Sequence, residues 1–283
     1  MMVGLLDLRQ LDERSFVGAA APERAGRMYG GQLLAQGLAA AQRCVDDDRP
    51  VHSLHGYFLR AGSVDRPVEL VVTAVRDGRS FSVREVSVGQ DGDELMRLLA
   101  SFHVPEDGLD YSPARQYEVP PPEAVTVTYD QFTRAHQPDP DEEWPGADRP
   151  MDIRYINAPR APEGQPVLEP QLMWVRISEE LPDDPRIHAA ALAYLADSTL
   201  VDHVMLPHGL RWQDGRLTGA SLDHAMWFHR PARADRWLLY DQQVEATAGA
   251  RGMTTGRLID SDGVVVTCGQ EGLMRWGQSR PAV

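Results

Sequence analysis

Two short stretches of the sequence share a pattern, and together they decide the fold that we expect. Residues 53–61 read SLHGYFLRA, and residues 222–231 read LDHAMWFHRP. Phe58 matches Phe228 at an offset of 170 residues, and an arginine follows each of them two positions later. Further along, the Asp-Gly pair at 91–92 matches the pair at 262–263 at an offset of 171, where hairpin turns are expected. A near-constant offset predicts that one structural unit occurs twice in the chain.

Each unit is expected to contain one helix followed by several strands. In the first unit, apolar residues recur at helical spacing over 31–45, and strand patterns follow near 52–59, 68–76, 80–89 and 94–104. In the second unit, the helix is predicted over 186–205, and strand patterns follow near 217–229, 237–246, 252–259 and 264–275. Short turns between the strands indicate mainly antiparallel sheets. The predicted class is therefore α+β, with a sheet curled around each helix.

The composition changes between the two units. Residues 105–170 are rich in proline and acidic residues, as in the triplet at 120–122, and this is typical of a connection rather than a core. We therefore expect a first unit at residues 1–110, a proline-rich connection at 111–168 and a second unit at 169–283.

The overall composition narrows the function. The 283 residues include 42 acids against 28 Lys plus Arg, and the formal net charge of −14 argues against nucleic-acid binding. All 28 basic residues are arginine, which excludes a pyridoxal Schiff base, a lysine aldolase and a Walker A site. Cys44 and Cys268 form no CxxC motif, which excludes a zinc ribbon or a dithiol redox site. Without a signal peptide or a long apolar run, we expect a cytoplasmic protein with no membrane span.

Asp197 is the first candidate for chemistry. It falls on the apolar stripe of the second predicted helix, between Tyr194 and Val201, where a carboxylate is costly unless it is hydrogen-bonded. Three interpretations stay open: Asp197 acts in a reaction, it satisfies a buried backbone group, or the helix breaks there. The stripe of the first helix consists of Leu, Ala and Val, so the first unit has no equivalent.

The run from Ser221 to His224 contains the residue types of a hydrolase triad. On a regular strand, Ser221 and Asp223 would share one face and His224 would point the other way. The sequence contains no GxSxG elbow, which disfavours a serine hydrolase built on that turn. A strand serine that hydrogen-bonds a neighbour is the simpler interpretation.

Three further features allow both a functional and a structural interpretation. Gln270 interrupts an apolar strand, and it would either position a water or hold a turn. Gly30 and Gly31 precede the first helix, and they would either expose its amides to an anion or form a turn. The histidine pairs at 52/55 and 224/229 would point to opposite faces of their strands, so no metal site is expected.

Longer strings in this order resemble the acyl-CoA thioesterase II family, the TesB-like double-hotdog enzymes. The resemblance extends from about Leu5 to Arg275 and is weakest in the proline-rich connection. Its firmest parts are residues 29–32, 52–60, 77–81, 222–231 and 270–275. The resemblance implies two tandem hotdog units in one chain, and hydrolysis of acyl-CoA to a fatty acid and coenzyme A without cofactor or metal.

The resemblance also implies the site. The family's triad of Asp, Thr or Ser, and Gln activates a water, and the matching positions here are Asp197, Ser221 and Gln270. Many members have Thr where Ser221 stands, but the hydroxyl is retained. The second unit would thus be the catalytic half. Some of the arginines are expected near the cleft, to meet the phosphates of coenzyme A, and association into dimers or tetramers is expected as well.

Two alternatives stay open. Hotdog enoyl-CoA hydratases pair an Asp with a His shortly after it, and His203 follows Asp197 here, although the Asn-Pro expected between them is absent. The other alternative is a protein that binds acyl-CoA without hydrolysing it.

Overall fold

The first half of the chain folds as a long helix covered by antiparallel strands. The computed structural model describes residues 1–21, 27–113, 117–135, 149–158, 164–211 and 215–277. The helix of the first half is α2 (Gly30–Gln42). It packs on β3 (Val51–Phe58), β4 (Val68–Asp77), β5 (Phe81–Gln90) and β6 (Asp93–His103). The predicted helix and these four strands are confirmed to within a few residues. The sequence did not predict α1 (Met2–Leu6), β1 (Arg9–Gln10) and β2 (Ser15–Gly18).

The second half repeats this order. Helix α4 (Pro185–Ala196) precedes β9 (Leu217–Ser221), β10 (Asp223–Phe228), β11 (Leu238–Ala248), β12 (Arg251–Ile259) and β13 (Val264–Trp276). Ahead of the helix, β7 (Met151–Tyr155) and β8 (Gln171–Ile177) add two strands that the sequence patterns did not predict. Shorter elements are η1 (Pro122–Ala124), α3 (Tyr129–Ala135) and η3 (Leu206–His208).

The prediction of one uninterrupted helix over 186–205 is wrong. Helix α4 ends at Ala196, and α5 (Leu200–His203) begins only after Thr199, whose φ of 67° is left-handed. A non-glycine residue in that conformation ends a right-handed helix, since the next turn cannot continue along the same axis. The break places Asp197 at the end of a helix rather than in the middle of one.

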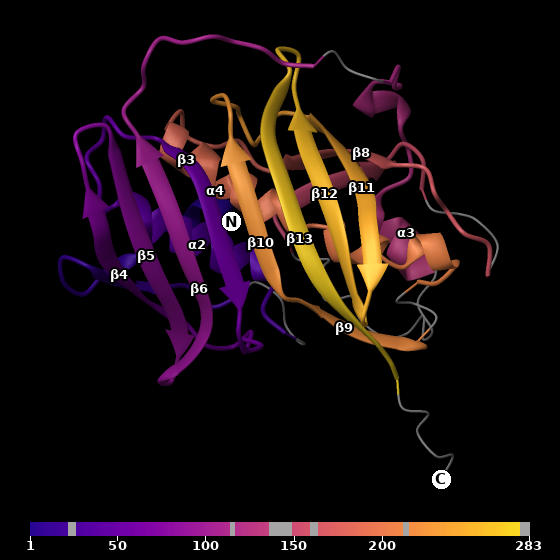
Figure 1. Cartoon of the computed structure of the whole chain (residues 1–283), viewed down its shortest axis with the longest axis horizontal. Coiled ribbons are helices and arrows are strands. Elements are labelled where there is room, and N and C mark those ends of the chain that lie inside the picture. Colours follow the sequence, from indigo (N-terminus) through magenta and orange to yellow (C-terminus); the bar gives the residue numbers. More distant parts are fainter. Residues whose placement is uncertain (22–26, 114–116, 136–148, 159–163, 212–214, 278–283) are drawn as a thin grey trace.

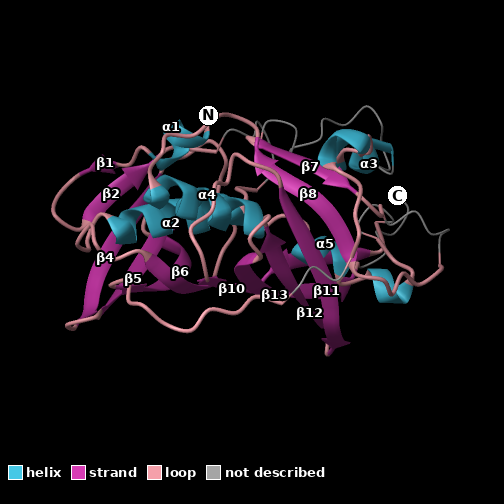
Figure 2. Ribbon diagram, turned by 90° about the horizontal axis from the view of Figure 1, so that it is seen from above, coloured by secondary structure: helices cyan, strands magenta, loops and turns pink. Residues whose placement is uncertain are grey.

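One sheet runs through both halves. Its strand order is β1-β2-β4-β5-β6-β3-β10-β13-β12-β11-β8-β7, with β9 also paired to β13 (Figure 1). Strands β3 and β10 are antiparallel neighbours in the middle and join the two halves. The sheet curls around α2 and α4, which lie side by side against its inner face (Figure 2). The predicted α+β class is therefore confirmed.

The hydrogen-bonding registers of the two halves coincide at a constant offset of 170 residues. Arg84 pairs with Ala100 in the first half, and the residues 170 positions later, Thr254 and Gln270, pair in the second. At the centre of the sheet, positions 55 and 225 pair with each other, again 170 apart. A pseudo-twofold axis therefore passes through the centre of the sheet, which supports the duplication predicted from the sequence.

The irregularities of the sheet recur as well. The register slips by one residue after Val51 in β3, and the same slip follows Ser221, 170 positions later, between β9 and β10. The Asp-Gly pairs do not correspond in this way. Residues 91–92 form the turn between β5 and β6, but the turn between β12 and β13 is closed by Asp260 and Gly263, so its central residues are 261–262. The offset of 171 between the Asp-Gly pairs is therefore not a structural equivalence.

The two long helices are antiparallel, and this brings the start of each against the end of the other. At one end, a Cβ on Gly31 would come within 2.5 Å of the carbonyl oxygen of Tyr194. At the other end, the Arg186 side chain donates to the carbonyl of Asp46 over 3.1 Å. Strands β3 and β10 lie beside both ends of the helix pair. The pseudo-twofold axis therefore relates two locations between the halves, one at each end of the pair. Among the described helices, none is long and apolar enough to cross a membrane.

Candidate active site

Asp197 lies at one of these two locations, where residues of both halves hold its carboxylate. It is the C-terminal cap residue of α4 and is only 8 % exposed. The Nε2 group of Gln270, on β13, donates to Asp197 Oδ1 over 2.5 Å. The backbone N–H of Gly31, at the start of α2, donates to the same carboxylate. A carboxylate at a helix N-terminus is also favoured by the helix dipole.

Side chains around the helix break satisfy the last carbonyl groups of α4. The hydroxyl of Tyr240 donates to the carbonyl of Ala196 over 2.5 Å, and that of Ser198 donates to Leu195 over 2.6 Å. The amide of Gln242 donates to the carbonyl of Ser198 over 3.1 Å. Unpaired carbonyls at a buried helix end would be costly, so these donors stabilise the break and fix the position of Asp197.

Gly30 is required by the close approach of Asp197. A Cβ at this position would lie 2.8 Å from Asp197 Oδ2 and 2.9 Å from the ring of Phe58, which is closer than real Cβ contacts come. The glycine pair was expected either to expose the amides of the helix to an anion or to form a turn. The structure shows an anion at the start of the helix. The anion is the carboxylate of Asp197 itself.

Burial raises the pKa of Asp197 to about 7 from its ordinary value of 3.8. The hydrogen bond from Gln270, the guanidinium of Arg149 and the Gly31 amide oppose this rise, because each of them stabilises the ionised form. Around neutral pH, protonated and ionised forms of Asp197 are therefore both populated. A carboxyl group with that property can accept a proton and return it under ordinary conditions.

Three buried polar residues form a row across the sheet beside this carboxylate. Gln270 pairs with Thr254 on β12, and the register of β10 places His224 on the other side of Gln270. All three are at most 1 % exposed, and His224 Nδ1 lies 3.8 Å from Asp197 Oδ1. Within the described part of the chain, Gln270 Oε1, Thr254 Oγ1 and both ring nitrogens of His224 have no hydrogen-bond partner. Unsatisfied polar atoms are rare in protein interiors, so their concentration near one carboxylate sets this group of residues apart from the rest of the core.

His224 is the residue that sequence reasoning misplaced. It was expected to point away from Ser221, but the one-residue slip after Ser221 reverses the alternation, so both residues point to the inner face. The alternation of His224 with Met226, which is fully buried, is the sequence signal that indicates the inner face. Burial lowers the pKa of His224 to about 3, so its imidazole is neutral at physiological pH.

Ser221 lies on the same face as Gln270, one strand away. It pairs with Gly272 and is half-buried, which puts it diagonal to Gln270, at roughly 7–8 Å between backbones. Among the described residues, its hydroxyl is hydrogen-bonded to neither Asp197 nor Gln270. The structure thus joins Asp197 and Gln270 directly and leaves Ser221 at the edge of the group.

Asp223 has a different environment. Its carboxylate accepts from the backbone N–H of Glu271 over 2.8 Å and lies 3.2 Å from His55 Nε2 on the outer face of the sheet. Ser221, Asp223 and His224 therefore do not assemble into a hydrolase triad, in agreement with the sequence interpretation.

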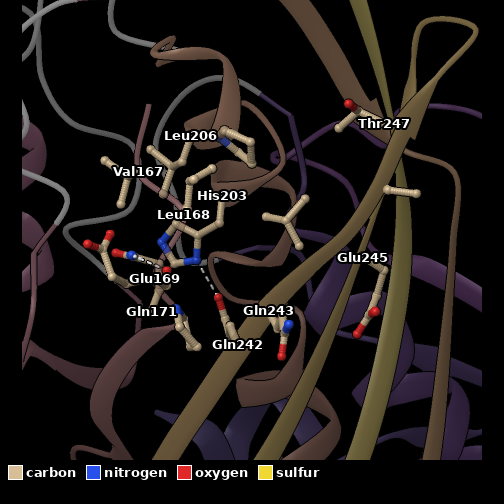
Figure 3. A pocket seen from close by; sticks show the side chains of 14 residues that line it. Val167, Leu168, Glu169, Gln171, His203, Leu206, Gln242, Gln243, Glu245 and Thr247 are labelled. Carbon is tan, nitrogen blue, oxygen red and sulfur yellow. Dashed lines mark hydrogen bonds between the residues drawn. The ribbon is translucent and has the colours of Figure 1, made fainter. Parts of the chain in front are cut away.

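His203, the residue that kept the hydratase alternative open, faces a separate pocket. Its Nδ1 lies 2.5 Å from Gln242 Oε1, and the hydroxyl of Tyr155 lies 3.3 Å from its Nε2. Figure 3 shows the ring beside Gln242 in a pocket of about 240 Å³ that residues 167–171 and 242–247 also line. The imidazole is therefore bound to groups other than Asp197, and the Asp-His arrangement of a hydratase is not formed by these two residues.

The cysteines offer no nucleophile. Cys44 and Cys268 are free thiols, and burial raises the pKa of Cys268 to about 12. A thiol with that pKa is protonated at neutral pH and unreactive. Among the described residues, no group of three or more His, Cys, Asp or Glu side chains is placed to hold a metal ion.

Comparison with known proteins places the chain in a family. Residues 144–273 match the family model described as acyl-CoA thioesterase, and residues 20–103 match the acyl-CoA thioesterase N-terminal domain. The chain belongs to the acyl-CoA thioesterase family. The paired helices and the continuous sheet are thus the double hotdog that the resemblance implied.

Relatives of this thioesterase family match along the whole chain. Acyl-coenzyme A thioesterase 8 of Homo sapiens is 36 % identical over 97 % of this chain and 89 % of its own length. Acyl-CoA thioesterase 2 of Haemophilus influenzae is 32 % identical and 98 % of each chain is covered. Among solved structures, the acyl-CoA thioesterase II TesB2 from Mycobacterium marinum superposes with a TM-score of 0.80, at 35 % identity over 98 % of this chain and 99 % of that chain.

Proposed function

We propose that this protein hydrolyses acyl-CoA thioesters to a free fatty acid and coenzyme A, with Asp197 as the general base. The observation that carries this assignment is the buried carboxylate of Asp197, which Gln270 and the start of α2 hold between the two halves. Family membership supports the substrate class. The unsatisfied polar atoms around the carboxylate support a bound water as the nucleophile.

The reaction follows from this geometry. Ionised Asp197 removes a proton from the water, and the water oxygen attacks the carbonyl carbon of the thioester. The C–S bond then breaks, the proton passes from Asp197 to the departing thiolate, and the acid and coenzyme A are released. General-base assistance of this kind is worth roughly 10²–10⁴ in rate.

The remaining groups have positioning roles in this proposal. The Oε1 atom of Gln270, which lacks a partner among the described residues, accepts a hydrogen from the water while Nε2 holds Asp197. The hydroxyl of Ser221 reaches the water from the neighbouring strand once substrate is bound. The start of α2, with its partial positive charge, stabilises the negative charge that develops on the thioester oxygen.

Thiol release from a series of acyl-CoAs, from acetyl to palmitoyl, tests the assignment. Wild-type protein should release coenzyme A, and Asp197→Ala should lose at least about a hundredfold in kcat. Asp223→Asn is the matched control, because it removes a carboxylate from the same region but from the outer face of the sheet. Folded wild-type protein that turns over no acyl-CoA in the series, or an Asp197→Ala variant with full activity, would contradict the proposal.

We also propose that the chain associates into dimers or tetramers through the outer face of the sheet. Tyr57, Leu99 and Trp227 lie on the adjoining strands β3, β6 and β10, and they are 55 %, 44 % and 48 % exposed. Large apolar side chains gathered on one face are typical of interaction surfaces. Light scattering on a size-exclusion column tests this proposal. A mass of 31.4 kDa, that of one chain, would contradict it.

We also propose a division of the chain into a non-catalytic unit at 1–110, a connection at 111–168 and a catalytic unit at 169–283. Strand β7 lies within the connection and pairs with β8 of the second unit.

The free thiols Cys44 and Cys268 support a reducing compartment, and we propose that the protein is located in the cytoplasm.

A further inference from the structure

The pseudo-twofold axis relates the Asp197 site to a cavity of about 1100 Å³ at the opposite end of the helix pair. The end of α2, the start of α4, the start of β3 and the residues that follow β10 line this cavity. Phe228 lines it in the way that Phe58, 170 residues earlier, contacts the start of α2 at the Asp197 site. The cavity therefore occupies the position at which a duplicated unit would carry its own catalytic site.

The residues at the catalytic positions are unreactive in the first half. At an offset of 170, Val51 stands where Ser221 stands, Leu54 where His224 stands, and Ala100 where Gln270 stands. In contrast to α4, which is capped by Asp197, α2 ends at Gln42 with Arg43 as its cap. The location thus has no carboxylate at the position of Asp197 and no amide at the position of Gln270, so it cannot activate water in the same way.

The lining of this cavity combines an apolar wall with charged groups of both signs. Val51, Leu192, Phe228 and Trp237 contribute apolar surface. Four arginines and five aspartates also line it: Arg186, Arg230, Arg233 and Arg236, and Asp47, Asp48, Asp183, Asp184 and Asp260. Three of the arginines form ion pairs with nearby acids, whereas Arg236 has no acidic partner within the described part of the chain. The apolar wall matches a hydrocarbon chain, and Arg236 is the lining arginine that is left to meet an anionic head group.

His188 supplies a hydrogen-bond donor that lacks an acceptor. The side chain lines the cavity from α4 and is only 4 % exposed. Its Nδ1 accepts the backbone N–H of Ala234 over 3.2 Å, so the neutral ring carries its hydrogen on Nε2. Burial lowers the pKa of His188, which keeps the ring neutral. Among the described residues Nε2 has no partner, and an unpaired buried donor favours a ligand that brings a carbonyl or carboxylate oxygen.

From these observations, we propose that the cavity is a second, non-hydrolytic binding site for a fatty acyl group, with the acyl oxygen at His188 Nε2 and the anionic group near Arg236. The ligand is either acyl-CoA or the fatty acid released from it, which have this chemistry in common. The proposal takes the acyl ligand from the proposed function, but it does not depend on the catalytic role of Asp197. The volume is at the upper end of small-molecule sites, about 300–1,000 Å³, and so accommodates an extended chain.

Binding stoichiometry tests the second site. The probe is a ketone analogue of palmitoyl-CoA, in which a methylene group separates sulfur from carbonyl so that hydrolysis cannot occur. Calorimetric titration of wild type should give two equivalents per chain. Ala189→Trp, which fills the cavity, should give one equivalent, and Arg236→Glu should weaken that same equivalent at least about tenfold. Arg9→Glu, on β1, is the control for charge reversal at an exposed arginine and should keep both.

Turnover of palmitoyl-CoA, measured on the same samples, separates the two proposals. The kcat/KM measured at low concentrations of palmitoyl-CoA should change less than about twofold in Ala189→Trp. An unchanged value reports that the catalytic half is folded. Free palmitate that displaces one equivalent would identify the product as the ligand, and displacement only by acyl-CoA would identify the substrate. One equivalent in wild type, or two equivalents that persist in both cavity variants, would overturn the second site whatever the activity. Absent turnover with two equivalents would instead contradict the proposed function alone.

Discussion

Gln270 and Asp197 are 73 residues apart in the sequence, and the amide of one donates to the carboxylate of the other over 2.5 Å. This single bond joins β13 to the end of helix α4. It also opposes the effect of burial on the carboxyl group, because a donor to an anion stabilises that anion. The protonation of Asp197 therefore depends on the amide of Gln270.

The dependence predicts a measurable pH shift. In wild type, kcat/KM should rise with pH and level off above an inflection near 7, since the ionised form of Asp197 is the active one. Gln270→Ala removes the opposing hydrogen bond, so the inflection should move to higher pH by about one unit and the rate at pH 7 should fall at least about tenfold. Gln243→Ala, at an exposed position on β11, is the control and should leave the profile in place. An inflection in Gln270→Ala at or below the wild-type value would exclude this coupling.

Asp197 should also destabilise the folded protein at neutral and alkaline pH. Its pKa is about 7 when folded and near 3.8 when unfolded, so between these values the folded state binds the extra proton. Stability contributed by this group is therefore lost as the pH rises from about 4 to about 7, up to about 4 kcal/mol. Asp197→Asn should melt at a higher temperature than wild type at pH 8, and the difference should shrink towards pH 5. Scanning calorimetry across this range checks it, and a difference that is constant with pH would refute it.

Gly30 should tolerate no side chain. In Gly30→Ala, the new Cβ would meet Asp197 Oδ2 at 2.8 Å, so either the carboxylate or α2 must move. We expect kcat to fall at least about tenfold and the melting temperature to fall by several degrees, as overpacking of this kind costs about 1–3 kcal/mol. Gly4→Ala is the matched control, because nothing lies within 4 Å of a Cβ there. Equal activity of the two variants in a thiol-release assay would show that the contact is not needed.

The hydroxyl of Ser221, rather than the identity of the residue, should matter. Ser221→Thr should keep kcat within about threefold, whereas Ser221→Ala should lose between about ten- and a hundredfold, since one contact to the water is removed. Both variants should melt close to wild type, because Ser221 is only half-buried. A fully active Ser221→Ala would remove this residue from the site and leave Asp197 and Gln270 as its functional pair.

Much of the fold could be predicted because short matching motifs in the two halves reveal the repeat. The offset between Phe58 and Phe228 is the offset of the whole sheet, and apolar periodicity located α2 and eight strand regions within a few residues. Strand β8 escaped prediction because it follows the proline-rich stretch and is buried along almost its whole length, so it shows no alternation.

The site was predicted less completely. Asp197 stood out as a charge on an apolar stripe, Ser221 and Gln270 were candidates that also allowed a structural interpretation, and the resemblance joined the three. His224 was assigned to the wrong face because a bulge of one residue has no composition of its own, yet it reverses every side chain beyond it. The helix break at Asp197 depends on donors from β11, such as Gln242 and Tyr240, that are distant in sequence.

The pairing of β3 with β10 in the middle of the sheet has a consequence for how the molecule can be divided. Alone, the first half would leave one edge of β3 unpaired and the second half one edge of β10, and each would expose the helix surface that the other half covers. The chain is thus equivalent to a heterodimer whose subunits have been fused. Cleavage between the halves would leave a nicked complex rather than two independent proteins, and fragments made separately would need each other to fold.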